Sequence, residues 1–329
     1  MRDTADGERL GGRRSLRGSR GIRRGNPRFL HGKGSAMNGP VVVGVDGSPS
    51  SLAAVEFAAR EAGLRGVRLR LVHAFVRPAA HIPAGGRPWE PSGAGLRELI
   101  DGTLTKAERR AHETAPGVEI VREVVVGEPL TVLEIESRTA SLAVVGSRGH
   151  SRFGALLLGS TAGHLAAHAA CPVLVVRGRP NPDGPVLLAV DGSPAARGAV
   201  EFAFALASLH GTDLVALHAW STRTERAYEA PADPPFVTYD EDRLRDEEER
   251  VLAEALGGLR DVYPDVAVDR RLVRGRIRHT LIEASAEAGF VVVGARGRGG
   301  FAGLLLGSVG QAVLHHAHCP VVVVRSGEG

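Results

Sequence analysis

Short runs of valine, leucine and alanine alternate with longer amphipathic segments along most of this chain. Valine-rich runs separated by helix-length segments are typical of parallel strands joined by crossover helices. The first half predicts strands at Pro40–Asp46, Val67–Ala74, Val118–Val126, Leu142–Gly146 and Pro172–Arg177. Helices are predicted between them at Ser50–Ala62, Leu96–Thr114, Leu130–Thr139 and Ser160–Ala169. The pattern therefore indicates an α/β fold with a doubly wound, five-stranded parallel sheet.

The same order returns after a short Pro/Gly-rich break, which neither a helix nor a central strand tolerates. Strands are predicted at Val186–Asp191, Asp213–Trp220, Val266–Val273, Phe290–Gly294 and Pro320–Arg325, and helices at Ala195–His210, Asp240–Val262, Ile277–Ala288 and Ser308–His316. The segment Val45-Asp46-Gly47-Ser48-Pro49 recurs as Val190-Asp191-Gly192-Ser193-Pro194. We expect a tandem duplication: a tail at 1–36, a first domain at 37–178, a linker at 179–184 and a second domain at 185–329.

One loop motif, Gly-x2-Gly-x9-Gly-Ser, follows the fourth strand of each half. Its fixed residues are Gly146, Gly149, Gly159 and Ser160 in the first half, and Gly294, Gly297, Gly307 and Ser308 in the second. Glycines allow positive φ and let a ligand approach the backbone. We expect Ser160 and Ser308 at helix N-caps, where free N–H groups and the helix dipole favour an anion. The alternative is a tight turn that the apolar residues Phe153, Leu156, Leu157 and Leu158 anchor to the core.

The strand ends supply the other parts of a predicted site. Asp46 and Asp191 end the first strands, and Ala74 and Ala219 end the second strands. Ligands of open parallel sheets bind beyond the carboxyl ends of the strands, where the strand order reverses. An acidic side chain there can accept hydrogen bonds from a ribose or hold a metal ion, and an apolar strand end can face a base. A nucleotide satisfies all of these features. Nearby arginines can either meet its phosphates or remain solvated: Arg148, Arg152, Arg296 and Arg298.

The net charge of +4 is unevenly distributed along the chain. Residues 1–36 hold ten Lys/Arg and three Asp/Glu, so the tail carries +7 and the remainder −3. The tail is rich in arginine, glycine and serine, and we expect a disordered extension upstream of a true start near Met37, or else a nucleic-acid-binding or targeting arm. We find neither an apolar run of about 20 residues nor a signal-peptide core. Free, buried Cys171 and Cys319 suit a reducing compartment, so we expect a cytoplasmic protein.

Other chemistries are disfavoured. No Gly-x4-Gly-Lys-Ser/Thr motif occurs, and the sequence Gly297-x-Gly299-x-x-Ala302 follows a fourth strand rather than the first strand of a dinucleotide fold. The cluster His315-His316-x-His318 has a single histidine at the equivalent positions of the first half, so we expect no metal site. His73 and His218 are expected to pack rather than to act as bases. No set of catalytic residues can be assembled from the repeats.

These motifs resemble the ATP-binding branch of the universal stress protein family. The resemblance covers residues 40–177 and 185–326 and depends on Val-Asp-Gly-Ser and the glycine loop in both halves. It implies the strand order 3-2-1-4-5 (adenine nucleotide alpha hydrolase-like), with Asp46 and Asp191 beside the ribose and phosphates of ATP. Thr161 and Val309 would join the fixed loop residues around the nucleotide, which Mg²⁺ can accompany. It also implies pairing of the fifth strands, here an intramolecular pseudo-dimer that could form further homo-oligomers.

The function expected from this resemblance is that of an ATP-binding stress-response protein in which the nucleotide is a bound regulator. One alternative is a slow Mg²⁺-dependent ATPase or nucleotidyl-transfer enzyme that uses Asp46 or Asp191. Another is a partner-binding module whose nucleotide sites are vestigial. The expected partner is an adenine nucleotide, with no membrane and no specific nucleic acid.

Overall fold

The computed structural model describes residues 39–76, 93–149, 158–179, 181–221, 241–298 and 305–325. The predicted tail at 1–36 lies outside these ranges. So do Arg152 and most of the apolar loop residues, Phe153, Leu156 and Leu157. Within the described ranges, no helix is both long enough and apolar enough to span a membrane.

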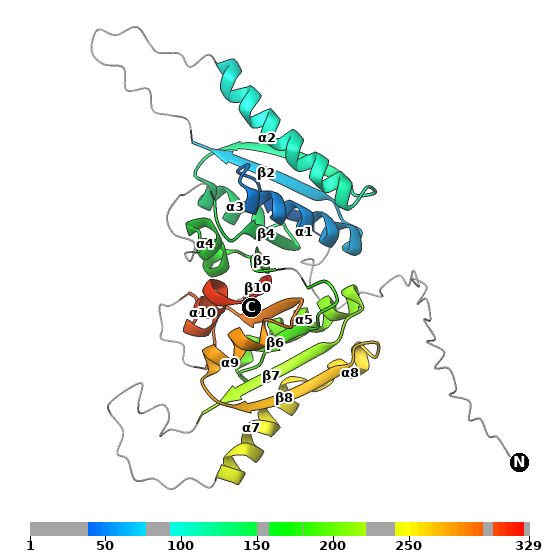
Figure 1. The fold of residues 1–329 in the computed structure, drawn as a ribbon, viewed down its shortest axis with the longest axis vertical. Coiled ribbons are helices and arrows are strands. Elements are labelled where there is room, and N and C mark those ends of the chain that lie inside the picture. Colours follow the sequence, from blue (N-terminus) through cyan, green and yellow to red (C-terminus); the bar gives the residue numbers. More distant parts are fainter. Residues whose placement is uncertain are drawn as a thin grey trace, which may run out of the picture. The chain divides into compact units, whose positions relative to one another are not determined.

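The first half alternates strands and helices as the sequence pattern predicts (Figure 1). Its strands are β1 (Val41–Gly44), β2 (Leu69–Phe75), β3 (Ile120–Val126), β4 (Leu142–Gly146) and β5 (Val173–Val176). Its helices are α1 (Pro49–Arg65), α2 (Gly93–Thr114), α3 (Pro129–Ser137) and α4 (Ser160–His168). Helix α1 continues past the predicted end at Ala62 and stops at Gly66, whose φ of 67° suits a residue without a Cβ.

The second half repeats this order. Its strands are β6 (Val186–Ala189), β7 (Leu214–Trp220), β8 (Val268–Arg274), β9 (Phe290–Gly294) and β10 (Val321–Val324). Its helices are η2 (Pro194–Ala196), α5 (Arg197–His210), α7 (Glu241–Ala255), α8 (Leu259–Val262), α9 (Ile277–Ala284) and α10 (Ser308–His316). The single helix predicted over Asp240–Val262 is wrong. It breaks into α7 and α8 because Gly258 adopts φ of 77°, a left-handed conformation that ends a helix.

All ten strands form one sheet in the order β3-β2-β1-β4-β5-β10-β9-β6-β7-β8. Each half therefore has the predicted order 3-2-1-4-5, and all ladders within a half are parallel. The two halves meet at β5 and β10, which run antiparallel with Val321 opposite Val175 and Val323 opposite Val173. This pairing hydrogen-bonds two strands that would otherwise be exposed sheet edges.

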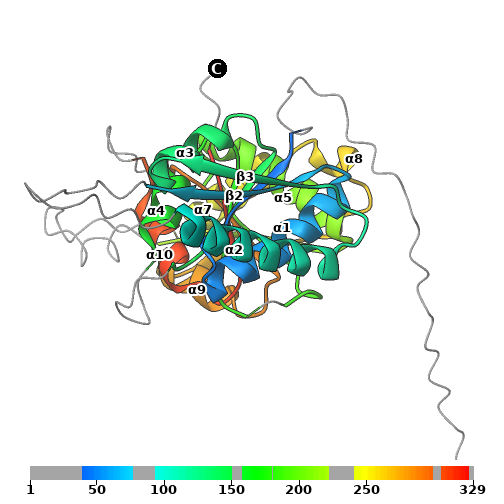
Figure 2. The ribbon, with the colours of Figure 1, turned by 90° about the horizontal axis from the view of Figure 1, so that it is seen from above.

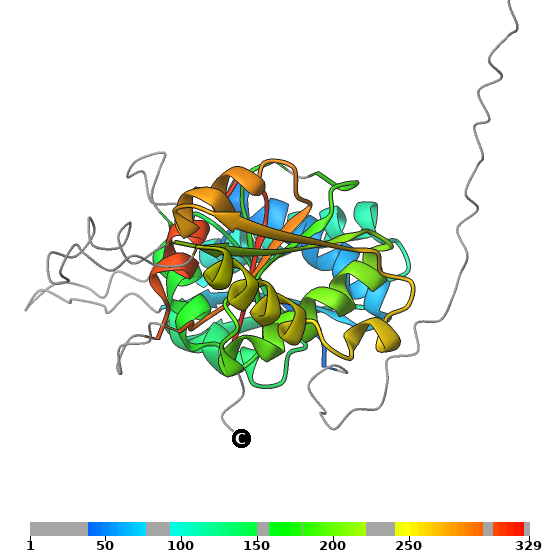
Figure 3. The ribbon, with the colours of Figure 1, turned by 90° about the horizontal axis from the view of Figure 1, so that it is seen from below.

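Helices cover both faces of the sheet. Alternate strand residues point to opposite faces, so Val41 and Val43 belong to the core cluster that contains residues of α1, α2, α5 and α7, and Val42 belongs to the one that contains residues of α3, α4, α9 and α10. Figure 2 shows α3 on one side of β2 and β3, with α1 and α2 on the other. Figure 3 shows the same layering around β8. Strands buried on both faces explain the nearly unbroken valine runs.

Polar contacts also join the halves. The guanidinium Nη1 of Arg177, just after β5, donates to the carbonyl oxygens of Val313 and Leu314 in α10. Arg325, at the equivalent position after β10, donates from Nη1 to the carbonyl oxygen of Ala167 in α4 at 2.8 Å. Each arginine thus binds carbonyl groups near the C-terminal end of a helix in the other half, where the helix dipole favours a cation.

A buried charged cluster forms a second bridge between the halves. Glu61 of α1 lies 2.6 Å from His210 Nε2 of α5 and also pairs with Arg65 at 2.9 Å. The Glu61 side chain is 1 % exposed. Burial opposes its ionisation and is the largest single effect on it. Together, the hydrogen bonds and charges of His210 and Arg65 outweigh burial and hold the pKa of Glu61 below its ordinary value of 4.5.

Candidate nucleotide-binding sites

A tight Asp-Gly-Ser turn follows the first strand of each half. In the first half, Asp46 Oδ1 accepts a hydrogen bond from the backbone N–H of Ser48 at 2.9 Å. In the second half, Asp191 Oδ1 accepts from both the backbone N–H and the hydroxyl of Ser193. The turn requires glycine because Gly47 has φ of 87° and Gly192 has φ of 68°. These bonds hold both carboxylates at the carboxyl ends of the first strands.

Ser48 has a second role that its counterpart lacks. Its hydroxyl accepts from the N–H of Ser51 and so caps α1. Ser193 uses its hydroxyl on Asp191 instead, and the following helix begins with a 3-10 turn that no side chain caps. The two copies therefore share the aspartate and differ in what surrounds it.

The glycine loop lies directly against the aspartate in each half. A Cβ built on Gly149 would lie 2.9 Å from Asp46 Oδ2, and one on Gly297 would lie 2.4 Å from Asp191 Oδ2. In the second half the N–H of Arg298 also donates to Asp191 Oδ2 at 3.0 Å. The prediction that the loop glycines supply positive φ is wrong, since none of the fixed glycines has one. They are needed because the backbone approaches the carboxylate too closely for a side chain.

Ser50, in the first turn of α1, belongs to the first site and was missed by sequence reasoning. A Cβ on Gly146 would lie 2.4 Å from Ser50 Oγ, and that hydroxyl accepts from the N–H of Arg148 at 3.3 Å. Gly294 has a different neighbour, the carbonyl oxygen of Arg296, 3.1 Å from a Cβ built there. The residue equivalent to Ser50 in the second half is Ala195, so the repeat gave no sign that Ser50 contacts the glycine loop.

The helix that follows each loop starts at the predicted serine, but the prediction that this serine is the N-cap is wrong. Gly159 and Gly307 occupy the N-caps, so Ser160 and Ser308 are the first helical residues and do not cap. Glycine takes this place because its N–H is tied back to the strand end: Gly159 donates to Ser147 and Gly307 to Ala295, each at 2.8 Å. No side chain caps either helix. The first-turn N–H groups, which include those of Thr161 and Val309, therefore have no intrahelical acceptor.

The ends of the second strands differ between the halves. Ala74 is half-buried on β2 and Ala219 is buried on β7, each on the far side of the first strand from the glycine loop. The histidines before them each lie with Nδ1 2.7 Å from a first-strand carbonyl, His73 from that of Val45 and His218 from that of Val190. This pairing ties the second strand to the first and agrees with the predicted packing role.

Among the described residues, a charged network beside this strand end is found in the second half. His218 Nε2 lies 2.7 Å from Glu248 of α7, and the same carboxylate lies 3.5 Å from the guanidinium of Arg298. The buried leucines Leu104 and Leu252 align α2 with α7, and on that alignment Ile100 occupies the place of Glu248. The first site is therefore apolar where the second carries a carboxylate. The repeat gave no sign of Glu248, because the helices α2 and α7 share no literal motif that aligns them.

The structure thus brings together the aspartate, the glycines and the helix start in each half. Asp46 meets Gly149, and a Cβ on Gly159 would lie 3.8 Å from the Gly149 nitrogen; Asp191 meets Gly297 in the same way. Ala74 and Ala219 are farther away, two strands from β4 and β9. Their strands are connected to the first strand of each half by the hydrogen bonds of the preceding histidines, His73 and His218. Each half has a carboxylate beside a glycine-lined helix N-terminus, an arrangement that fits a sugar hydroxyl next to phosphates.

Comparison with known proteins agrees with this architecture. The universal stress protein family profile matches residues 37–177 and 184–325. The chain is 39% identical over 307 residues to universal stress protein Rv1996 of Mycobacterium tuberculosis, covering 87% of this chain and 94% of that protein. It is also 39% identical over 295 residues to Rv2623 of the same species, covering 87% and 96%. A crystal structure of a universal stress protein from Archaeoglobus fulgidus shares the fold, with a TM-score of 0.62, 20% identity and coverage of 90% and 99%. The chain is a tandem member of the universal stress protein family.

Proposed function

We propose that each half binds one ATP and that the nucleotide acts as a bound regulator in a stress response. The observation that carries this proposal is the contact of Asp46 with Gly149 and of Asp191 with Gly297. In both halves the carboxylate lies at the edge of a loop that leads into a helix without a side-chain cap. The carboxylate can accept bonds from the ribose, and the N–H groups can bind phosphate oxygens.

A regulatory role is favoured over catalysis by the hydrogen bonds that the aspartates already make. Asp191 accepts from two groups of Ser193 at Oδ1 and from Arg298 at Oδ2. Oδ2 keeps room for one further hydrogen bond, which a ribose hydroxyl can supply, and the carboxylate then has no free position to act as a base or to hold Mg²⁺ by itself. We therefore propose that Mg²⁺, where it accompanies the nucleotide, is held mainly by the phosphates. A slow ATPase remains the second candidate function, and steady ADP release by the purified protein would favour it.

We further propose that the two halves act as one intramolecular pair. The antiparallel β5–β10 ladder joins them in a single sheet, and the exchanged contacts of Arg177 and Arg325 connect the helix after each glycine loop to the other half. An event at one loop can therefore reach the other through α4 and α10. The buried thiols Cys171 and Cys319 are both free, which fits the reducing cytoplasm that we propose as the location.

Calorimetric titration of the full chain with ATP and Mg²⁺ tests the proposal. The expected stoichiometry is near two, and mass spectrometry of ligand released from the purified protein should show an adenine nucleotide. Aspartate variants provide the control: Asp46→Asn and Asp191→Asn should each weaken one site and leave the other unchanged. A stoichiometry near zero in a protein that is folded by circular dichroism would refute the proposal.

A further inference from the structure

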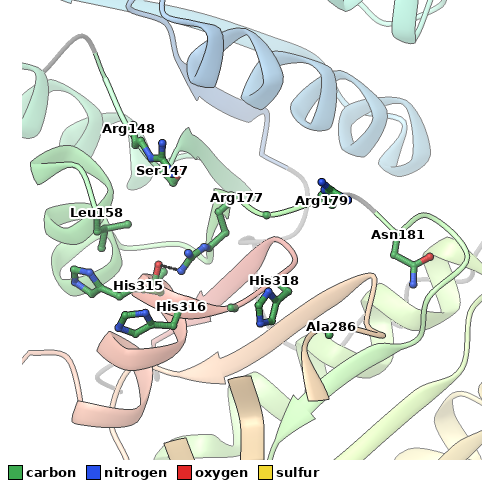
Figure 4. Close-up of a pocket in the computed structure, with 13 residues that line it drawn as sticks. Ser147, Arg148, Leu158, Arg177, Arg179, Asn181, Ala286, His315, His316 and His318 are labelled. Carbon is green, nitrogen blue, oxygen red and sulfur yellow. Dashed lines mark hydrogen bonds between the residues drawn. The ribbon is translucent and has the colours of Figure 1, made fainter. Parts of the chain in front are cut away.

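A cleft of about 800 Å³ lies between the halves and adjoins the first glycine loop. Its walls come from the start of the first glycine loop, the segment after β5 and the C-terminal end of α10 (Figure 4). The aspartates, glycines and serines predicted to hold the nucleotide do not line it, although Arg148 of the first glycine loop does. The cleft therefore adjoins the first nucleotide site but is lined by a different set of side chains.

The charged residues that line this cleft all belong to the basic types, and among the described lining residues there is no carboxylate. We call them the seam cluster: Arg148, Arg177, Arg179, His315, His316 and His318. In Figure 4, Arg177 lies between the segment that carries Arg148 and the end of α10 that carries His315 and His316. Groups of one sign gathered in a cleft produce a field that attracts ions of the opposite sign.

The members of the seam cluster disfavour one another's positive charge. Burial, and after it the charge of Arg148, holds the pKa of Arg177 below its usual value. Burial likewise lowers the pKa of His315, and the charges of His316 and Arg177 lower it further. The Nε of Arg177 is buried and has no hydrogen-bond partner among the described residues. A bound anion would offset this repulsion, which no protein carboxylate lining the cleft does.

The duplication shows that the histidines are particular to this side of the molecule. The positions equivalent to His315, His316 and His318 in the first half are Ala167, His168 and Ala170. A helix C-terminus accommodates one histidine through its dipole, yet α10 and the turn after it carry three. The extra histidines face a cleft that also contains arginines from the other half, so the tertiary structure joins two basic sets that are far apart in the sequence.

We propose that the seam cluster binds a small multivalent anion of the polyphosphate class. Arginine presents several N–H donors in a planar fork, and histidine adds single donors, which suits a group with several charged oxygens. The cleft lies between the segment that follows β5 in the first half and α10, the helix that follows the second glycine loop. Occupancy would therefore strengthen the contact between the two halves.

Inorganic tripolyphosphate is the probe, titrated into the full chain by calorimetry at low salt. The double variant Arg179→Gln/His316→Gln removes two cleft groups whose side chains have no hydrogen bond to another described residue, and its affinity should fall at least tenfold. The matched control Arg109→Gln/His279→Gln removes the same residue types from exposed helix surfaces, where their side chains are 69% and 64% exposed. The control should bind within twofold of the unmodified protein.

A third variant separates this proposal from the proposed function. Gly297→Val disrupts the second glycine loop, whose residues do not line the cleft, so it should lower the ATP stoichiometry from near two to near one and keep tripolyphosphate binding. The proposal is overturned if tripolyphosphate binding disappears with Gly297→Val, or if the Arg179→Gln/His316→Gln variant binds like the control. As a second measurement, the ring signals of His315 should shift with tripolyphosphate in NMR spectra, and those of His73, which lies on β2, should not.

Discussion

At the scale of single residues, the candidate sites depend on the absence of a side chain at one position in each loop. Gly149 and Gly297 lie against aspartate oxygens so closely that a Cβ would contact them within 3 Å. Neither is among the glycines with a positive φ, so the backbone itself tolerates other residues. Space alone makes glycine necessary, and a bulky substitution should push the loop off the carboxylate.

Replacing Gly149 with valine tests this explanation. We expect ATP stoichiometry to fall from near two to near one, with at least a tenfold loss of affinity at the first site, because valine displaces the loop from Asp46. Gly297→Val should do the same at the second site. Gly117→Val is the control, since a Cβ there meets nothing within 4 Å and its φ is not positive. Equal calorimetric curves for Gly149→Val and Gly117→Val would contradict the assignment.

Glu248 makes the two sites unequal. Its carboxylate contacts His218 and Arg298 and adds a negative charge on the side where the first half has Ile100. Glu248→Gln keeps a hydrogen-bonding group and removes the charge, so the second site should bind ATP about fivefold more tightly, roughly 1 kcal/mol at a partly exposed position. The measurement is calorimetry in a Gly149→Val background. Glu247→Gln, whose side chain is 44% exposed and pairs with Arg243, should have no effect; weaker binding in Glu248→Gln would refute the argument.

At the scale of elements, the strands and helices follow from local patterns, and the exceptions have local causes. The predicted helix over Asp240–Val262 breaks where Gly258 takes a left-handed conformation. The helices after the loops begin at glycine N-caps because those glycines are already tied to the strand ends. The connections between elements of different halves follow no such local pattern.

Arg325 provides a test of one such connection. It donates to the carbonyl oxygen of Ala167 near the end of α4 at 2.8 Å, and a hydrogen bond from a charged group stabilises by about 1.5–3 kcal/mol. Arg325→Ala should lower the free energy of unfolding by about 2 kcal/mol in urea denaturation. Arg197→Ala is the comparison, because that side chain is 85% exposed and its ion pair contributes at most about 1 kcal/mol. The explanation fails if the two variants are equally stable.

At the scale of the whole molecule, the halves bury a carboxylate, Glu61, and two thiols, Cys171 and Cys319. The carboxylate makes stability depend on pH, and the thiols become reactive only when the core opens. Glu61 of α1 and His210 of α5 belong to different halves, and their side chains are in direct contact. In the repeat, the position of Glu61 corresponds to Leu206. The ion pair is therefore an addition to one copy and holds the two copies together.

Glu61→Gln should destabilise the protein by about 3 kcal/mol, because it leaves buried Arg65 without a countercharge. The pKa of Glu61 is lowered on folding, so its contribution is present above its ordinary value of 4.5 and is lost as the pH falls through the folded value. Urea denaturation at pH 7 and pH 3 should show the gap between variant and unmodified protein narrowing at pH 3. Glu113→Gln, in an exposed pair with Arg109, should change stability by less than about 1 kcal/mol.

The two thiols report on opening of the core. Burial is the main cause that raises the pKa of Cys171 and of Cys319 to about 12 each. Because the thiolate is the reactive form, native protein should react negligibly with iodoacetamide at pH 8, and both thiols should react in denaturant. Mass spectrometry counts the alkylated sites. Rapid labelling of one cysteine in the native state would show that its half opens locally.

The sequence determines the elements and their order, because hydrophobic periodicity, turn residues and a literal repeat are local signals. Valine runs marked the strands, the repeated Asp-Gly-Ser turns and glycine loops marked both sites, and the strand order followed from resemblance to a known family. The fit of Gly149 against Asp46 and the addition of Ser50 were not predicted, since they depend on side chains 98 or more residues apart in the chain. The pairs Glu61–His210 and Arg177–α10, and the seam cluster, exist only when the two halves are folded onto one another. Their residues carry no shared periodicity, so only the packing of distant surfaces brings them into contact.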